Sequence, residues 1–188
     1  MIPIERDPPG RVRRTVWIGA CALFLAPLVA MQFTHQVVWT ANDFLVLGTM
    51  LLVALASYEL AERNTRSAAY RWAAGITIVA AFFLVWADLA VGLIGSEDNP
   101  ANLIYLGVLG VPVLGGLAAR FRARPMAYVL LTTAIAQLSA GIVALLGNLG
   151  AEASGWPRDV TALTGIFIGL WLAAAFLFRR AAREEMAA

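Results

Sequence analysis

Lysine is absent from the sequence, and all 14 basic residues are arginine. Without a lysine amine the chain cannot form a Schiff base, which excludes a retinal protein. There is one cysteine, Cys21, and one histidine, His35. One residue of each type supplies no CxxC pair, no bis-histidine haem site and no histidine-rich zinc cluster. The sequence therefore predicts no cofactor and no resident metal.

Charged residues are also few, and apolar residues take their place. Of the 188 residues, 61% are hydrophobic and 14% are charged. A soluble domain of this size could not bury that much apolar surface, so the composition indicates a membrane protein. Six segments are apolar over the roughly 20 residues that a helix needs to cross a bilayer. They predict an all-α, polytopic bundle of antiparallel-connected helices in a single membrane domain, residues 1–188, with helices over residues 15–33, 43–61, 71–95, 101–119, 126–148 and 160–178.

The arginines alternate between the two sides of the predicted bundle. Arg158 lies alone between the fifth and sixth segments, and the other thirteen lie in every second loop and at both ends. The positive-inside rule places those thirteen, and both termini, in the cytoplasm. There the guanidinium groups should contact anionic lipid headgroups. The thirteen are Arg6, Arg11, Arg13, Arg14, Arg63, Arg66, Arg71, Arg120, Arg122, Arg124, Arg179, Arg180 and Arg183.

The first apolar segment has a second interpretation. A basic stretch, residues 11–14, precedes it, as in a secretory signal peptide. The apolar run is long for such a peptide and no small-residue cleavage site follows it, so we expect an uncleaved first helix.

Two polar side chains lie inside predicted spans. Asp88 falls in the outer half of the segment 71–95, where a carboxylate must face the bundle or a wet crevice. It could bind a proton or cation, or it could be a protonated carboxyl that locks helix packing. Gln137 lies near the middle of the segment 126–148, and its amide favours a hydrogen bond between helices over a transport role.

A second candidate site lies on the outer loops, which collect carboxylates and amides. Oxygen ligands suit a hard cation, and a histidine could join a softer site. Helix caps are the alternative explanation, since Thr40-Ala-Asn-Asp43 has the spacing of a capping box and Asn99-Pro100 reads as a helix start. The candidate residues are His35, Asp43, Glu97, Asp98, Asn99 and Asn102. Trp39, Trp86, Trp156 and Tyr105 are predicted as interfacial anchors on the same side.

Small residues recur at every fourth position of the last segment, at Thr161, Gly165, Gly169 and Ala173. Gly165 and Gly169 form a GxxxG pattern, which lets two helix backbones approach closely. We expect Gly165, Gly169 and Ala173 to form a helix-packing seam. The seam could lie within the bundle, or it could join a second copy or a partner subunit.

Two stretches of the sequence resemble a known family. They are Met31-Gln-Phe-Thr34 with Trp39-Thr and Asp43-Phe44, and Gly95-Ser-Glu-Asp-Asn-Pro-Ala-Asn102. The family is one of small proteobacterial polytopic inner-membrane proteins without an assigned function, and the likeness spans most of the chain. It implies a bacterial inner-membrane location and the same topology, but no activity. Its members tend to be acidic at the positions of His35 and Gln36, which weakens an outer cation site.

Three functions follow from these patterns. The first is a non-enzymatic membrane component that acts through helix contacts, as an accessory subunit or a homo-oligomer. The second is a small proton- or cation-coupled transporter or channel that uses Asp88. Prolines inside the first and fourth segments, Pro27 and Pro112, favour it through a possible inverted repeat. The third, an enzyme, would have to use Asp88, Glu97, Asp98 and His35 without a recognisable motif, so we expect no enzyme and no nucleic-acid partner.

Overall fold

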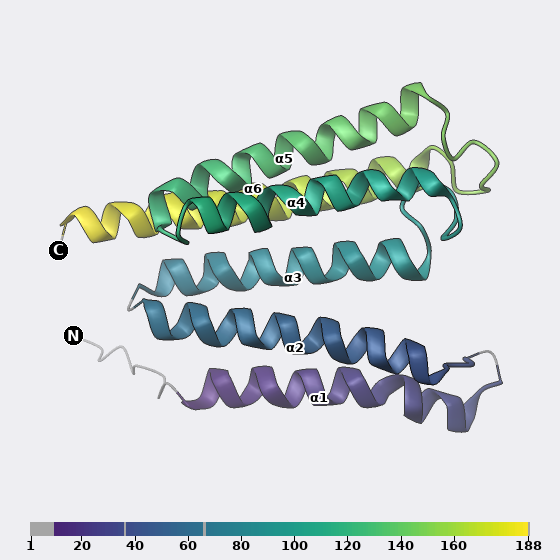
Figure 1. The fold of residues 1–188 in the computed structure, drawn as a ribbon, viewed down its shortest axis with the longest axis horizontal. Coiled ribbons are helices and arrows are strands. Elements are labelled where there is room, and N and C mark those ends of the chain that lie inside the picture. Colours follow the sequence, from purple (N-terminus) through teal and green to yellow (C-terminus); the bar gives the residue numbers. More distant parts are fainter. Residues whose placement is uncertain (1–9, 36, 66, 188) are drawn as a thin grey trace, which may run out of the picture. The chain divides into compact units, whose positions relative to one another are not determined.

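The computed structural model describes residues 10–35, 37–65 and 67–187, which form six α-helices, one 3₁₀ helix and no strand (Figure 1). The predicted all-α architecture of six helices is confirmed. Each helix is long and apolar enough to cross a membrane, so the protein is an integral, multi-pass membrane protein. The elements are α1 (Gly10–Phe33), α2 (Ala41–Asn64), α3 (Ala68–Ala90), η1 (Pro100–Leu103), α4 (Ile104–Ala118), α5 (Ala123–Leu146) and α6 (Arg158–Ala187).

Three helix ends differ from the prediction by five residues or more, and the first is that of α1, which begins at Gly10 rather than Thr15. α3 ends at Ala90 rather than Gly95, and α6 continues to Ala187, nine residues beyond the predicted Phe178. A 30-residue helix is about 45 Å long, which exceeds the hydrocarbon thickness of about 30 Å. The last turns of α6, which carry Arg179, Arg180 and Arg183, therefore extend past the apolar span.

The chain divides into two compact units, residues 1–59 and 60–188. In the first unit α1 and α2 pair through two sets of contacts. The Arg13 Nε atom lies 2.6 Å from the Glu59 Oε1 atom, which also accepts a 3.0 Å bond from the Trp17 indole N–H. Phe24 and Phe44 pack edge to face with ring centroids 5.8 Å apart. The prediction of a single membrane domain stays a prediction.

In the second unit, α6 packs against both α3 and α5, and α4 packs against α5. Small residues allow the closest approaches. A Cβ atom added to Gly141 of α5 would lie 2.8 Å from the Thr164 side chain of α6, and one added to Gly115 of α4 would lie 2.8 Å from Val129 of α5. The helices of this unit therefore approach through glycines on α4 and α5.

One end of the second unit, which we call the loop end, holds residues 91–99 and 147–157. Gly92 and Gly95 adopt left-handed backbone angles, with φ of +71° and +83°. They fold residues 91–99 back so that Leu93 and Ile94 are buried. Asn99 donates to the carbonyl of Leu149, 2.6 Å away, and so joins the two loops.

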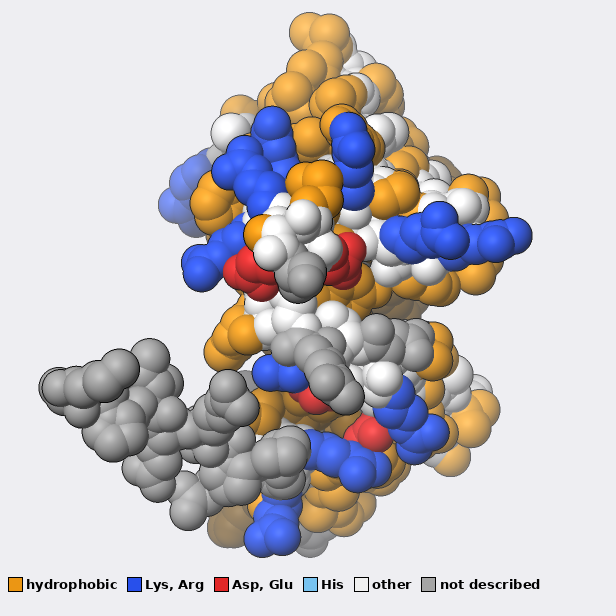
Figure 2. Space-filling view, turned by 90° about the vertical axis from the view of Figure 1, so that its left-hand side faces the viewer, with side chains coloured by type: hydrophobic (Ala, Val, Ile, Leu, Met, Phe, Trp, Pro, Cys, Tyr) orange, Lys and Arg blue, Asp and Glu red, His pale blue; other side chains and the backbone are white. Residues whose placement is uncertain are grey.

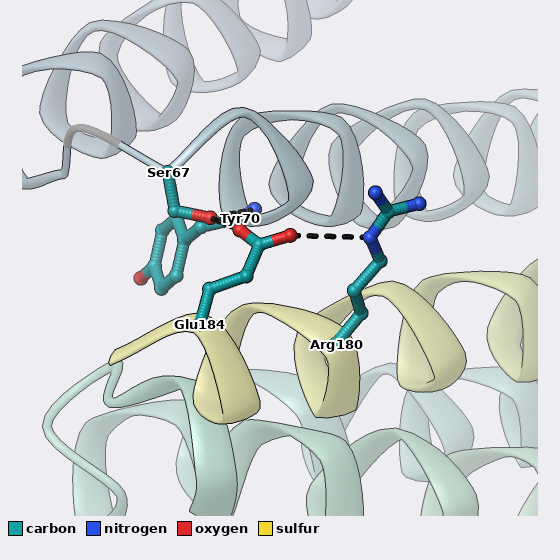
Figure 3. A network of polar contacts seen from close by, with 4 residues as sticks. All are labelled: Ser67, Tyr70, Arg180 and Glu184. Carbon is teal, nitrogen blue, oxygen red and sulfur yellow. Dashed lines mark hydrogen bonds and ion pairs between the residues drawn. The ribbon is translucent and has the colours of Figure 1, made fainter. Parts of the chain in front are cut away.

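The opposite end, which we call the arginine end, holds the start of α3, the α4–α5 turn and the last turns of α6. Ser67 caps α3 by accepting from the Tyr70 N–H, and its hydroxyl donates to Glu184, which also pairs with Arg180 (Figure 3). The Tyr70 hydroxyl donates to the Phe121 carbonyl at 2.6 Å.

Exposed arginines gather at the arginine end (Figure 2). Arg158 instead lies at the loop end, where it pairs with Asp159 at 3.3 Å. The described part of the second unit thus has the predicted alternation, while Arg6 and Arg66 lie outside the described residues. The exposed arginines of the arginine end are Arg120, Arg122, Arg124, Arg179, Arg180 and Arg183.

Candidate functional site

Asp88 lies in the last turn of α3, at the loop end. Because α3 ends at Ala90, the carboxyl lies nearer the end of its helix than a helix running to Gly95 would place it. The side chain is half-buried, and its Oδ1 atom is buried without a hydrogen bond to any described residue. A carboxyl oxygen in that position lacks the protein partner that buried polar groups normally have.

Tyr105 lies near this carboxyl, and Thr164 lies near Tyr105. Tyr105, on α4, is 1% exposed, and its hydroxyl lies near Asp88. Thr164, on α6, is near enough to influence the same hydroxyl, yet the geometry of the two hydroxyls does not make a hydrogen bond. Both oxygens are therefore buried without a partner among the described residues.

Gln137 of α5 is fully buried, and neither its oxygen nor its nitrogen makes a hydrogen bond within the described chain. It lies one helical turn from Gly141, which meets Thr164. Its neighbours Thr133 and Ser139 instead donate to carbonyls of their own helix. The interhelical bond that we predicted for Gln137 is therefore not present in the structure.

Trp171 of α6 is also fully buried, and its indole N–H has no partner among the described residues. It lies two turns along α6 from Thr164. Long side chains lean toward the N-terminus of their own helix. Helices α5 and α6 run in opposite directions. The Gln137 side chain is therefore expected to lean toward the arginine end and the Trp171 side chain toward the loop end, which brings the two closer in depth.

These five side chains, Asp88, Tyr105, Thr164, Gln137 and Trp171, form what we call the polar core. At about 1.5 Å per residue, its Cα atoms span depths from about 1.5 Å for Tyr105 to about 20 Å for Trp171, measured from the loop-end termini of their helices. Sequence reasoning identified Asp88 and Gln137. It missed Thr164 and Trp171, and it assigned Tyr105 to the membrane interface although the residue is buried.

The carboxylates and the histidine predicted for an outer cation site do not come together in the structure. The Asp43 carboxylate accepts from both the N–H and the hydroxyl of Thr40, at 2.7 and 2.9 Å, so Asp43 caps the start of α2 with one of the two bonds of the predicted capping box. His35, Glu97 and Asp98 are exposed. Among the residues that the structure describes, no three His, Cys, Asp or Glu side chains come close enough to hold a metal ion.

Asn99 and Asn102 hold the loop 91–99 together. The Asn99 side chain accepts from the Ala101 N–H at 3.0 Å, as an N-cap of η1, and donates to the carbonyl of Ile94. Asn102 is 5% exposed; it accepts from the Ile94 N–H at 2.8 Å and donates to the Ser96 carbonyl at 2.7 Å. Both amides are thus engaged by the backbone, which favours the structural interpretation over a cation site.

The predicted seam on α6 does not pack inside the bundle. Gly165, Gly169 and Ala173 are exposed, and a Cβ atom added to either glycine would meet nothing within 4 Å. Within the second unit these residues therefore form no seam, and the helix-packing seam stays a prediction. The buried face of α6 is formed instead by Thr164, Phe167, Trp171, Ala174, Ala175 and Phe178.

No protein-family model, curated protein or solved structure matches this chain. The resemblance to the proteobacterial family therefore stays a prediction.

Proposed function

We propose that the protein is a non-enzymatic component of a bacterial inner membrane that acts through contacts between α6 and a transmembrane helix of a second protein chain. The exposed row Thr161, Gly165, Gly169 and Ala173 carries this proposal. Glycine inside a helix is less favourable than alanine by about 1 kcal/mol, and a Cβ atom at either glycine would meet no described residue within 4 Å. A helix from another chain would gain from them, because small residues allow close backbone approach in a membrane.

The test replaces each glycine by leucine. We expect Gly165→Leu and Gly169→Leu to convert the assembled species into a smaller one in native mass spectrometry, because the added side chain holds the two backbones apart. Gly107→Leu is the matched control, since Gly107 of α4 also faces open space but lies on another helix. An assembly that survives both substitutions on α6, or a wild-type protein that is a monomer without a partner, contradicts the proposal.

We also propose, from the distribution of arginines, that the arginine end faces the cytoplasm. With the arginine end in the cytoplasm, its guanidinium groups would contact anionic headgroups. Reporter fusions at the α4–α5 turn, next to Arg122, should therefore give the cytoplasmic signal, and fusions near Arg158 the opposite one. Cytoplasmic activity at both positions contradicts this orientation.

A second candidate function is proton or cation transport through Asp88. The observation that favours it is the buried, unpartnered Oδ1 atom of a carboxyl within a membrane span. Ionisable groups at such a depth usually serve an ion or proton path. Flux into proteoliposomes tests this candidate.

A further inference from the structure

The carboxylates in the last turns of α6 lie toward α3. Glu184 accepts from the Ser67 hydroxyl at the start of α3, and it also accepts from Arg180, as Figure 3 shows. Glu185 lies near Tyr70, which belongs to α3 as well. Among the described residues of these turns, the side of α6 away from α3 therefore carries no carboxylate.

Arg179 and Arg183 lie on that other side of α6. Thr164 marks the direction of α5, which it meets at a glycine. At about 100° per residue, Arg179 is turned by about 60° from Thr164 and Arg183 by about 100° in the same sense. Phe178, which faces α3, is turned by about 40° in the opposite sense. Both arginines are exposed, and neither makes an ion pair with a described residue.

Arg124 of α5 lies on the same side of the α5–α6 pair. It is turned by about 100° from Gly141, which faces α6, whereas Val129, which faces α4, is turned by about 120° in the opposite sense. Because α3 contacts α4, the sides of α5 and α6 that turn away from these two helices coincide. Arg124 is exposed and, like the two arginines of α6, has no ion pair with a described residue.

These three arginines, Arg124, Arg179 and Arg183, also lie at nearly the same depth, and we call them the basic triad. Helices α5 and α6 are antiparallel and meet where Gly141 approaches Thr164. At about 1.5 Å per residue, Arg124 is about 26 Å from that contact, and Arg179 and Arg183 are about 23 and 29 Å from it, all toward the arginine end. Figure 2 shows a group of basic side chains on one side of this end. The basic triad therefore brackets the α5–α6 junction where the apolar spans end.

The surface next to the basic triad is first aromatic and then apolar. Tyr128, about one turn along α5 from Arg124, is exposed. Tyrosine is enriched where a membrane meets water, with its ring at the level of the headgroups. Farther toward the loop end, the same side exposes Leu131 and Ile135 of α5 and Leu172 of α6. Charged, amphipathic and apolar groups thus follow one another in the order of a phospholipid's phosphate, glycerol and acyl chains.

We propose that the basic triad and this surface bind one anionic phospholipid, with its phosphate among Arg124, Arg179 and Arg183 and its acyl chains along α5 and α6. Guanidinium groups match phosphate oxygens with paired N–H donors. A zwitterionic lipid carries the same phosphate together with an ammonium group, which the triad repels, so the positive charge selects an anionic headgroup. The site goes beyond a general contact with headgroups, because it includes these three arginines and leaves out Arg120 and Arg122 of the same end.

Native mass spectrometry of the full-length protein, titrated in detergent with phosphatidylglycerol or with phosphatidylcholine of the same acyl chains, tests this proposal. We expect the wild type to bind phosphatidylglycerol at least about tenfold more tightly, because each arginine near a headgroup contributes roughly fivefold. The double variant Arg179→Gln with Arg183→Gln should lower that affinity to the value for phosphatidylcholine. Arg124→Gln should lower it about fivefold and tests the site from α5, even if the double variant does not fold.

Arg120→Gln with Arg122→Gln is the matched control. It removes the same charge from the same end, but Arg122 is turned by about 100° from Gly141 toward α4, and Arg120 lies in the α4–α5 turn. We expect this variant to keep the affinity for phosphatidylglycerol within about twofold, since charges beyond a Debye length are screened.

Four outcomes would overturn the proposal. Equal wild-type affinity for the two lipids is the first. An equal loss in the two double variants is the second, because it means a diffuse attraction to the whole arginine end. Displacement of the lipid by inorganic phosphate is the third, since the site would then bind an anion without acyl chains. The fourth is loss of a co-purified protein from the Arg179→Gln, Arg183→Gln variant with lipid binding unchanged, which would assign the triad to a protein partner.

The lipid site can fail separately from the proposed function. It rests on the location of the protein in a membrane, and on neither the α6 assembly nor the side that the arginine end faces. Gly165→Leu measures the assembly and the reporter fusions measure the orientation, so a negative lipid titration leaves both results unchanged.

Discussion

Gly92→Ala should lower the apparent melting temperature in detergent by about 5–10 °C, equivalent to about 2–4 kcal/mol. Gly92 has φ of +71°, which a residue with a Cβ atom adopts only with strain. The added Cβ would also overlap the backbone carbonyl of Ser96 and lie 2.6 Å from the Glu97 nitrogen. The loop 91–99 would have to open, which takes Leu93 and Ile94 out of the core. Differential scanning fluorimetry on the intrinsic tryptophans measures the shift.

Gly75→Ala is the matched control, because it makes the same chemical change inside α3. A Cβ at Gly75 meets nothing within 4 Å, and alanine is the better helix former by up to about 1 kcal/mol. The two variants should therefore shift the melting temperature in opposite directions. If Gly92→Ala has the same melting temperature as the wild type, Gly92 does not adopt the left-handed conformation after α3.

This turn also shows how far the sequence determined the fold. Hydropathy located all six helices, because a span must be apolar over its whole length. It could not place the end of α3, since residues 91–94 are as apolar as a helix. They are apolar for another reason: Leu93 and Ile94 belong to a buried loop. Local apolarity does not distinguish a helix from a loop that packs into the same core.

The face of α6 could not be predicted for a related reason. In water the buried face of a helix is its apolar face, but in a membrane the lipid-facing side is apolar too. Hydropathy does not distinguish the two faces of α6. One face carries Gly165 and Gly169, and the other carries Phe167 and Trp171. Small residues suggested the contact, whereas the bulky side turned out to face α3 and α5.

The sequence predicted a residue of the candidate site only where a strongly polar side chain interrupts an apolar segment. Asp88 and Gln137 stand out in apolar segments. Tyr105, Thr164 and Trp171 do not, because these residue types are common at interfaces and in bundle cores. Their shared feature is a polar atom without a partner, which depends on how four helices meet and is not visible in any one of them.

Asp88→Asn should reduce proton or Na⁺ flux to the rate of protein-free liposomes if the transport candidate is correct. Asparagine has nearly the shape of aspartate but can neither bind an exchangeable proton nor carry the negative charge that attracts a cation. Proteoliposomes loaded with a pH indicator, and driven by a potassium diffusion potential, measure the proton arm. Isotopic Na⁺ uptake measures the cation arm.

Loss of flux must be separated from loss of fold and from a general effect of surface charge. Asp88→Asn replaces a half-buried ionisable group by a neutral one of similar size, so we expect its melting temperature to match or exceed that of the wild type. Glu152→Gln removes an exposed carboxylate from the same end of the unit and should retain full flux. Wild-type flux in Asp88→Asn, or a wild-type protein no faster than empty liposomes, removes the transport candidate. In either case the α6 assembly function stands, because it depends on the exposed glycines and not on this carboxyl.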